Sequence, residues 1–576
     1  MYILGINAYH ADASACLIKD GKVLFAIEEE RLNRIKHWSG LPVRAIKLCL
    51  DDAGISMSDV NHITVSKDPK ARFFDKILYA IRNPGLFLSV KNRAENALKV
   101  QSVLKDIYNE LSIGGVLSSA PTVHFIEHHR AHNASAFYAS PFEESALLSI
   151  DGMGDFTSTM LGYGKGTKMS VQDTISYPHS LGYLYMAMTQ FLGFRNLGDE
   201  YKVMGLAAYG SATFYPQLKE IIDIKPDGLF ELKSEYFSHF RHGVKMTWEN
   251  GVPSVDSLYT PQWQTKFGPI RRQNESIEEH HKDLAASLQL ITEEAIFSLC
   301  ETVHKKTKSR NLCLSGGVAQ NSVVNGKIID NTPFKNLYVP PASHDAGTAI
   351  GSALYFYHHI RGKARGVNFH NPYTGARYLN EEIKSLLDKR GIPFIEYEED
   401  NICEHAAQAL IDRKVIGWFQ GRTEFGPRAL GNRSILVDPT RLDAKDLLNI
   451  KIKRREDFRP FATSILKERA EDFFDHAHDA NYMERVFHVK KEKRHLIPAV
   501  VHTDGTGRVQ TVNKDLNPKF HNLIDSFYKK TQIPLLLNTS FNENEPIVNA
   551  PEYALDCFLR TDMDILVLEN ILVNKS

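Results

Sequence analysis

A pattern of three short apolar segments separated by tight turns occurs twice in this chain, and it limits the possible folds more than any other feature. The segments of the first copy are residues 2–7, 13–18 and 22–27, and those of the second are residues 146–150, 157–163 and 169–175. Asp20-Gly21 and Gly164-Lys165-Gly166 are hairpin signals between the last two segments of each copy. Two such units predict two similar lobes that face a cleft.

The glycine turns beside these segments predict where a phosphate group would bind. Duplicated lobes are the layout of actin-like ATPases, whose turns hold phosphates between the lobes. The apolar segment 312–314 adds a strand, a glycine turn and a helix from Val318, which place backbone N–H groups beside the positive end of a helix. We therefore expect a nucleotide site, although neither turn fits a Walker A or GxGxxG sequence. Its expected residues are Gly152, Gly154, Gly316, Gly317 and Asn321, with Lys202 and Gly205 from the companion segment 200–210.

A second α/β region follows a polar, small-residue stretch at residues 361–366. Such a stretch is typical of a domain boundary, so we expect an N-terminal domain of residues 1–365 and a C-terminal domain of residues 366–576. The alternation of elements then restarts, with helices predicted near 379–390 and 401–413 and a strand at 415–419.

The charge balance and the cysteine pattern exclude several classes of protein. Lys plus Arg and Asp plus Glu both total 69, and a neutral chain is poorly suited to sequence-independent nucleic-acid binding, which must neutralise many phosphates. No stretch approaches the ~18 apolar residues that cross a bilayer, and the first residues lack the basic segment of a signal peptide. The six cysteines form no CxxC pair. We expect a cytoplasmic protein that binds neither nucleic acid nor membrane.

Two histidines four residues apart suggest a metal site. His128 and His132 lie in a helix-compatible run, so both imidazoles leave the same face of the helix. Asp151 ends an apolar segment, and Asp345 lies at a predicted strand-to-helix turn. This nitrogen and oxygen set fits Fe, Mn or Zn better than Ca. A solvated helix face is the alternative interpretation of the histidine pair.

A histidine and an aspartate near the first predicted strand end suggest acid–base chemistry. His10 and Asp12 follow the apolar segment 2–7, so His10 is a candidate general base and Asp12 its orienting acid. A purely structural role for the pair is the alternative.

Arginines placed beside Gly, Pro and Phe form a third group. Arg428, Arg459 and Arg508 occur in such surroundings, where a fixed guanidinium can bind phosphate or carboxylate with two hydrogen bonds. For Lys451, Arg454 and Arg455 a solvated helix face is the better interpretation. An RNA groove would need a row of stacking aromatic residues, which the segment lacks.

Long sequence matches make the chain similar to the ATP-dependent O-carbamoyltransferases, the family of the nodulation protein NodU and the cephalosporin and tobramycin carbamoyltransferases. The matching segments are GINAYHADASACL, EEERLNRIKHWSGLP, EHHRAHNASAFYASPF, DGMGD, EYKVMGLAAYG, LSGGVAQN, SHDAGTAIGSAL, GRTEFGPRALGNRSILVDP, KRREDFRPFATSIL, DGTGRVQTV and LLLNTSFNENEPIV. The resemblance implies a two-lobed, actin-like N-terminal domain, akin to the tRNA threonylcarbamoyladenosine transferase fold, and a YrdC-like α/β C-terminal domain.

The resemblance also implies roles for individual residues. Iron, or a similar divalent metal, would be held by His128, His132, Asp151 and Asp345, and the nucleotide phosphates would lie near the glycine-turn residues named above. Carbamoyl phosphate would be bound by Arg428, Lys453, Arg459 and Arg508. The chain departs from the family pattern at Glu543-Asn544-Glu545 and at Thr463, which affects details of the C-terminal pocket.

The expected function is therefore transfer of a carbamoyl group, by way of carbamoyl adenylate, to a hydroxyl of a small molecule. The expected partners are ATP with Mg²⁺, carbamoyl phosphate and an acceptor such as a sugar, an antibiotic or another secondary metabolite; a homodimer is compatible with the sequence. A tRNA threonylcarbamoyl-type transferase and a non-catalytic actin-like ATPase scaffold are the alternatives, and the neutral charge balance disfavours the first.

Overall fold

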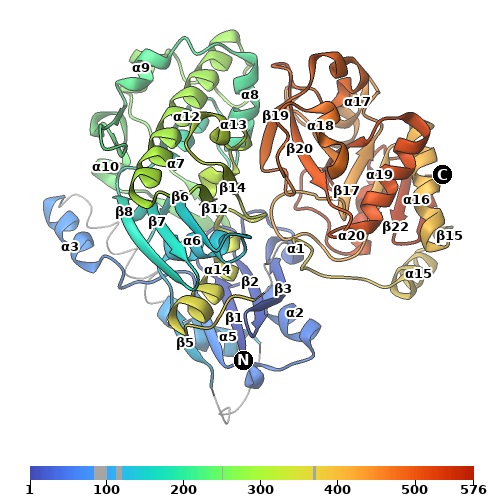
Figure 1. Cartoon of the computed structure of the whole chain (residues 1–576), viewed down its shortest axis with the longest axis horizontal. Coiled ribbons are helices and arrows are strands. Elements are labelled where there is room, and N and C mark those ends of the chain that lie inside the picture. Colours follow the sequence, from blue (N-terminus) through green and yellow to red (C-terminus); the bar gives the residue numbers. More distant parts are fainter. Residues whose placement is uncertain (84–99, 112–119, 250, 367–370, 576) are drawn as a thin grey trace. The chain divides into compact units, whose positions relative to one another are not determined.

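A computed structural model of the chain describes residues 1–83, 100–111, 120–249, 251–366 and 371–575. The chain divides into two compact units, Met1–Phe369 and His370–Ser576, and each is described by itself below. Figure 1 labels their helices and strands.

The first lobe of the N-terminal unit is built on a five-stranded sheet. Its strands are β1 (Tyr2–Asn7), β2 (Ser14–Lys19), β3 (Lys22–Glu28), β4 (His62–Val65) and β5 (Thr122–Phe125). Their order is β3-β2-β1-β4-β5, with β1, β2 and β3 antiparallel and β1, β4 and β5 parallel. β1 and β2 are buried along nearly their whole length, because both faces of this part of the sheet are covered.

The second lobe repeats this topology. Its strands are β6 (Glu144–Gly154), β7 (Thr157–Lys165), β8 (Lys168–Ser176), β13 (Asn311–Ser315) and β14 (Asn336–Tyr338), in the order β14-β13-β6-β7-β8. Again an antiparallel meander is extended by two parallel strands. The identical strand order confirms the predicted duplication and the two-lobed, actin-like arrangement.

Helices complete the N-terminal unit. α6 (His128–Phe137) and α14 (Thr348–Leu354) pack against each other, and a Cβ on Gly351 would lie 1.9 Å from the Ala131 carbonyl oxygen, so this glycine permits the close helix approach. The long α12 (Glu279–Thr307) runs along the second lobe (Figure 1). The remaining helices are α1 (Glu30–Asn33), α2 (Val43–Ala53), α3 (Phe73–Arg82), α5 (Val103–Glu110), α7 (Leu181–Phe191), α8 (Glu200–Leu206), α9 (Tyr215–Lys219), α10 (His239–His242), α11 (Gln262–Phe267) and α13 (Ser322–Asn331).

Two short hairpins lie outside the main sheets of this unit. They are β9 (Ile222–Ile224) with β10 (Phe230–Leu232), and β11 (Met246–Glu249) with β12 (Val252–Val255).

One prediction about the second lobe is wrong in its detail. The helix after the Ser315-Gly316-Gly317 turn begins at Ser322 rather than at Val318. Residues 317–320 form a 3-10 turn, because the Asn321 side chain accepts a hydrogen bond from the Val324 N–H and caps α13. The glycine turn therefore precedes a 3-10 turn and not an α-helix N-terminus.

The C-terminal unit is an α/β structure with one nine-stranded mixed sheet, in the order β15-β23-β22-β16-β17-β21-β18-β20-β19. The strands are β15 (Ile395–Glu396), β16 (Ile416–Phe419), β17 (Arg433–Val437), β18 (Ala462–Leu466), β19 (Arg485–His488), β20 (Thr506–Val512), β21 (Leu535–Ser540), β22 (Ile565–Leu568) and β23 (Ile571–Asn574). The helices are α15 (Asn380–Lys389), α16 (Glu399–Ile411), α17 (Ala444–Asp446), α18 (Ala470–Phe473), α19 (Pro518–Thr531) and α20 (Pro551–Arg560). A single apolar core joins the sheet to these helices.

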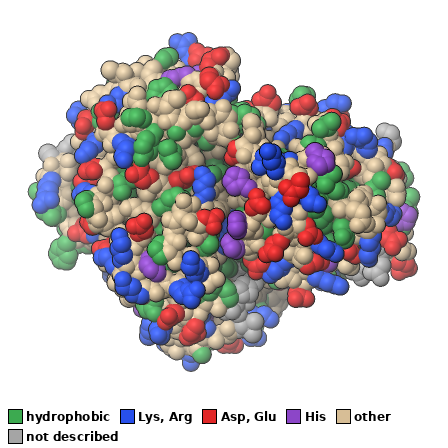
Figure 2. Space-filling model, turned by 45° about the horizontal axis from the view of Figure 1, so that its top comes forward, with side chains coloured by type: hydrophobic (Ala, Val, Ile, Leu, Met, Phe, Trp, Pro, Cys, Tyr) green, Lys and Arg blue, Asp and Glu red, His purple; other side chains and the backbone are tan. Residues whose placement is uncertain are grey.

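The surface carries mixed charge. On the face shown in Figure 2, acidic and basic side chains of the described residues alternate, without an extended area of one sign. Among the described helices, none combines the length and the apolar character needed to cross a membrane.

A candidate metal centre and its surroundings

Four buried side chains converge in the N-terminal unit. His128 and His132 come from α6, Asp151 from β6, and Asp345 from the turn before α14. The two Nε2 atoms are 3.0 Å apart. His128 Nε2 lies 3.4 Å from both Asp151 Oδ2 and Asp345 Oδ1, and His132 Nε2 lies 3.3 Å from Asp345 Oδ1. The structure thus brings together all four residues for which the sequence predicts a metal site.

Local interactions fix the histidines. The Glu127 carboxylate caps α6 by accepting a hydrogen bond from the Arg130 N–H at 2.8 Å, and Asp155 accepts one from the His128 N–H at 2.9 Å. Gly154 leaves room for the His128 ring, since a Cβ there would lie 2.0 Å from its Cδ2 atom. These contacts set the start of the helix and the direction of the His128 imidazole.

The charges of the four groups depend on one another. Burial opposes ionisation of both aspartates. The hydrogen bond and charge of His128 nevertheless lower the pKa of Asp151 to about 2, and the charge of His10 holds the pKa of Asp345 well below its usual range. Burial likewise opposes protonation of His128, but the two carboxylates raise its pKa well above the ordinary value. The pKa of His132 is lowered by burial and by the charge of His128. Two carboxylates therefore attract positive charge into this group.

The donor set fits a divalent cation. The distances from the two histidine Nε2 atoms to each other and to the two carboxylates run from 3.0 to 4.0 Å, and atoms that share one ion at about 2.1 Å are separated by up to about 4.2 Å. Among the described residues, buried Asp345 Oδ1 has no hydrogen-bond partner. Two imidazoles and two carboxylates suit Fe, Mn or Zn. The group could therefore hold a metal ion.

The predicted pairing of His10 with Asp12 is wrong. His10 Nδ1 lies 2.5 Å from Asp345 Oδ2, so the carboxylate that orients His10 belongs to the candidate metal centre. The His10 and His128 rings are neighbours, with centroids 5.0 Å apart. Asp12 instead pairs with His37, whose Nδ1 atom is 2.7 Å from Asp12 Oδ1. The left-handed backbone at Asp12, with φ of 55°, places the two side chains of the loop in different surroundings.

His37 is a neighbour of this site that residue-by-residue reasoning missed. The sequence marks His37 only as part of the family-like segment EEERLNRIKHWSGLP. This segment runs from the last residue of β3 through α1 into the loop beyond it. Burial acts to lower the pKa of His37, but the charge and hydrogen bond of Asp12 outweigh it and raise it to about 9.

The glycine turns lie against the candidate metal centre, and one of their backbone N–H groups already has a protein partner. The Gly317 N–H donates to Asp151 Oδ1 at 2.8 Å, so this amide positions a candidate metal ligand. Gly316 has φ of +90°, and a Cβ there would lie 2.2 Å from the Ile150 carbonyl oxygen. Gly152 tolerates a Cβ at 3.4 Å from Tyr183.

Three other residues predicted for the nucleotide site have different surroundings. The Asn321 amide donates to Gln289 Oε1 at 2.9 Å besides capping α13, and Lys202 forms an ion pair with Asp199 at 3.1 Å. Gly205 lies within α8, one residue from Met204, whose sulfur contacts Ser322 at the start of α13. α8 therefore borders the glycine turn, but Lys202 and Asn321 already have protein partners.

In the C-terminal unit, a buried carboxylate organises the loop that carries Arg428. Glu424 Oε1 accepts hydrogen bonds from the N–H groups of Leu430, Asn432 and Arg433 at 2.7, 2.8 and 3.1 Å. The buried Arg433 donates to several backbone carbonyls, including Gln420 O at 2.6 Å, and its guanidinium stacks 3.6 Å from the Phe419 ring centroid. Arg433 is thus structural, while Arg428 is half-buried.

The four residues predicted to bind carbamoyl phosphate influence one another in pairs. Burial and the charge of Arg428 hold the pKa of Arg508 well below its usual range, and the Arg508 Nε–H donates to the Met483 carbonyl at 2.6 Å. Burial also lowers the pKa of Lys453, with contributions from the charges of Arg455 and Arg459. The Lys453 ammonium donates to Ser540 O and, at 2.7 Å, to Asn542 Oδ1. Lys453 therefore holds the loop after β21.

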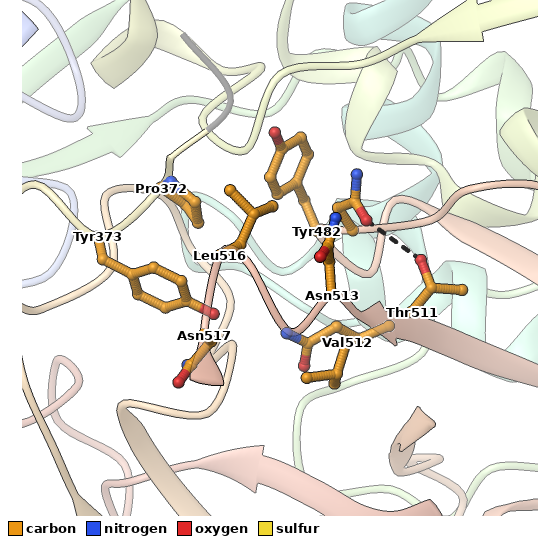
Figure 3. A pocket seen from close by; sticks show the side chains of 10 residues that line it. Pro372, Tyr373, Tyr482, Thr511, Val512, Asn513, Leu516 and Asn517 are labelled. Carbon is orange, nitrogen blue, oxygen red and sulfur yellow. Dashed lines mark hydrogen bonds between the residues drawn. The ribbon is translucent and has the colours of Figure 1, made fainter. Parts of the chain in front are cut away.

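A small pocket lies beside β20 in the same unit (Figure 3). Gln510, two residues after Arg508, lines it, and the rings of Tyr373 and Tyr482 stand at its walls. Thr511 donates to Asn481 at 3.2 Å within the lining. The full lining is Pro372, Tyr373, Asn481, Tyr482, Gln510, Thr511, Val512, Asn513, Leu516 and Asn517. The pocket has no ionisable acid or base except the tyrosines.

The N-terminal unit therefore combines two repeated actin-like lobes with a buried His/Asp group that could hold a metal ion. The chain belongs to the carbamoyltransferase family. The family model for the carbamoyltransferase N-terminus matches residues 2–354, and that for the carbamoyltransferase C-terminus matches residues 407–575.

Relatives match over most of the chain. An uncharacterised protein of Synechocystis sp. is 38% identical over 610 residues, covering 100% of this chain and 97% of its own. The nodulation protein NolNO of Sinorhizobium fredii is 37% identical over 580 residues, covering 99% and 80%. The nodulation protein NolO of Bradyrhizobium diazoefficiens is 38% identical over 458 residues, covering 78% and 79%. The chain is accordingly a transferase of carbamoyl groups.

Proposed function

We propose that the chain is an ATP-dependent O-carbamoyltransferase that uses carbamoyl phosphate and ATP to make carbamoyl adenylate, and passes the carbamoyl group to a hydroxyl of a small acceptor. Residues 366–576 form the adenylate and residues 1–365 carry out the transfer. The observation that carries the proposal is the convergence of His128, His132, Asp151 and Asp345 in the unit that matches the carbamoyltransferase N-terminal model.

The basic residues of the C-terminal unit suit the first half of this chemistry. Carbamoyl phosphate is a dianion, and Arg428 and Arg508 lie close enough for the charge of one to affect the other, which favours binding of an anion between them. Hydrolysis of carbamoyl phosphate gives carbamate and phosphate. A carbamate oxygen then attacks the α-phosphorus of ATP, pyrophosphate leaves with Mg²⁺, and carbamoyl adenylate results. Fixed guanidinium groups would stabilise the charge on the leaving phosphate.

The N-terminal unit suits the second half. His128, His132, Asp151 and Asp345 would hold the metal, for which we propose Fe²⁺. When bound, such an ion supplies Lewis acidity toward a phosphoryl or carbonyl oxygen. His10 would accept the proton of the acceptor hydroxyl through Nε2, because its Nδ1 atom faces Asp345 Oδ2. The hydroxyl oxygen bonds to the carbamoyl carbon, the bond from that carbon to the phosphate oxygen breaks, and AMP leaves.

Product analysis tests the proposal. The full chain is incubated with ATP, Mg²⁺, Fe²⁺, carbamoyl phosphate and a panel containing glucose, N-acetylglucosamine, tobramycin and erythromycin, and the products are followed by mass spectrometry. We expect AMP and pyrophosphate to form only when carbamoyl phosphate is present, and one panel compound to gain one carbamoyl group. AMP formation at the same rate with and without carbamoyl phosphate would contradict the proposal.

The same assay separates the alternatives. A tRNA threonylcarbamoyl-type transferase would require threonine and bicarbonate, and the mixed charge on the face in Figure 2 does not favour tRNA as its acceptor. A scaffold ATPase would hydrolyse ATP at the same rate with and without carbamoyl phosphate.

A further inference from the structure

His37 is held in one orientation beside the candidate metal centre. Its Nδ1 atom lies 2.7 Å from Asp12 Oδ1, and its backbone N–H donates to Glu30 Oε2 at 2.8 Å. A Cβ on Gly198 would lie 2.3 Å from His37 Nε2, so the imidazole ring packs directly against that glycine. The ring has little freedom to turn.

The loop that supplies Asp12 is fixed as firmly. Asn7 donates from its side-chain amide to the carbonyls of Ala11 and Asp12 at 2.9 and 3.0 Å. Asp12 and His37 both have φ of 55°, a left-handed conformation that costs energy in a residue with a side chain and recurs at functional sites. The surrounding contacts hold both residues in this conformation.

His37 and Asp12 form a dyad, in which the Nε2 atom of His37 remains available to a ligand. Among the described residues, no hydrogen-bond partner is found for His37 Nε2, and the side chain is 32% exposed. Burial acts against protonation of His37, but the Nδ1–H group donates a hydrogen bond to the Asp12 carboxylate, whose charge raises the pKa of His37 to about 9. The ring is therefore an imidazolium at neutral pH, and Nε2 is a donor rather than an acceptor.

The dyad is close to the proposed transfer site. Asp12 Oδ2 lies 4.0 Å from His344 Nε2, and the next residue, Asp345, belongs to the candidate metal centre. Gly198, against which the imidazole packs, lies two residues before α8. The Gly317 amide already donates to Asp151, so this backbone N–H does not serve an anion at the candidate metal centre.

We propose that His37 Nε2–H binds an anionic phosphoryl oxygen of the substrate in the N-terminal unit, with Asp12 as its positioning residue. The inference rests on the proposed function, in which that oxygen belongs to the AMP part of carbamoyl adenylate. Free phosphate carries the same kind of oxygen and is the other ligand that could supply it.

Histidine-selective NMR of the full chain tests this directly. The ¹⁵N-histidine resonance that is absent from His37→Gln identifies His37 and is followed during titration with AMP, adenosine or inorganic phosphate. AMP should shift it and adenosine should not. Calorimetry should show His37→Gln weakening AMP binding about tenfold or more, as expected for a charge-assisted hydrogen bond, with adenosine binding unchanged. The exposed His242→Gln is the matched control.

The results distinguish AMP from free phosphate as the ligand of His37, and they show whether His37 binds a phosphoryl oxygen at all. A His37 resonance that moves with phosphate as much as with AMP supports free phosphate as the source. A resonance that moves with neither, or equal weakening of AMP and adenosine, overturns the inference. Gly198→Ala, which displaces the ring but keeps the histidine, should weaken AMP binding in the same direction, and provides the test if His37→Gln does not fold. Carbamoylated product from the wild-type chain, alongside an unmoved His37, would show that this inference alone has failed.

Discussion

At the scale of single residues, His10 carries the proposed proton transfer. Replacing it with alanine removes the imidazole that faces Asp345, while the C-terminal unit keeps every residue. We expect His10→Ala to form carbamoyl adenylate and pyrophosphate from ATP and carbamoyl phosphate at the wild-type rate, and to transfer the carbamoyl group roughly 10²- to 10⁴-fold more slowly, the range typical of a general base. Pyrophosphate release and carbamoylated product are measured in one reaction.

His242→Ala is the control, since His242 is exposed on α10. It should retain both rates. Unchanged transfer in His10→Ala would refute the role of His10 as the base.

A second residue-scale prediction concerns pH. The pKa of His37 is raised from 6.5 to about 9 in the folded chain, so its pairing with Asp12 stabilises the fold fully below pH 6.5 and loses this effect as the pH rises through 9. Allowing for the solvent exposure of the side chain, the contribution is about 1 kcal/mol. Urea titrations of the full chain should show that the difference in free energy of unfolding between wild type and His37→Gln shrinks from pH 6 to pH 9.5. A difference that grows instead would contradict the ion pair.

These residues show what spacing can and cannot predict. The separation of His128 and His132 fixes a common helix face, and apolar strands lead to Asp151 and toward Asp345, so the cluster follows from local rules. The partner of Asp12 does not, because the left-handed backbone at Asp12 turns the carboxylate toward His37, which is 25 residues away. No local pattern in the sequence specifies that contact.

At the scale of elements, the end of β6 allows a matched pair of substitutions. A Cβ on Gly154 would lie 2.0 Å from His128 Cδ2, whereas one on Gly152 would meet Tyr183 at an ordinary 3.4 Å. We expect Gly154→Ala to displace His128 and reduce bound metal at least tenfold, and Gly152→Ala to keep it. Metal content after desalting, measured by mass spectrometry, checks both; equal content in the two variants would contradict the packing argument.

The elements themselves were largely predictable where the sequence pattern is local. Apolar segments separated by Asp-Gly or Gly-Lys-Gly turns became β1–β3 and β6–β8, and residues 379–390, 401–413 and 415–419 contain α15, most of α16 and β16. The start of α13 was not predictable in this way, because the Asn321 side chain, rather than the glycine turn, caps the helix. Likewise, nothing local indicates that Glu424 gathers three N–H groups to shape the Arg428 loop.

At the scale of the whole molecule, the basic residues and the candidate metal ligands lie in separate compact units. The two half-reactions should therefore respond to different treatments of one intact chain. Arg428→Ala should lower pyrophosphate formation from ATP and carbamoyl phosphate by at least tenfold, because Arg428 and Arg508 would no longer act together on the phosphate. Its metal content should equal that of the wild type.

Removal of the metal should stop the transfer step and leave adenylate formation intact. A chelator competes for an ion held by His128, His132, Asp151 and Asp345, and bound metal stabilises the folded unit that contains them. The chelated full chain should still form carbamoyl adenylate and pyrophosphate when carbamoyl phosphate is present, yet transfer no carbamoyl group, and its N-terminal unit should unfold at a lower urea concentration. Adding Fe²⁺ should restore transfer. If chelation instead stopped pyrophosphate formation, the metal would serve adenylate formation, and the assignment of the two half-reactions to the two units would be contradicted.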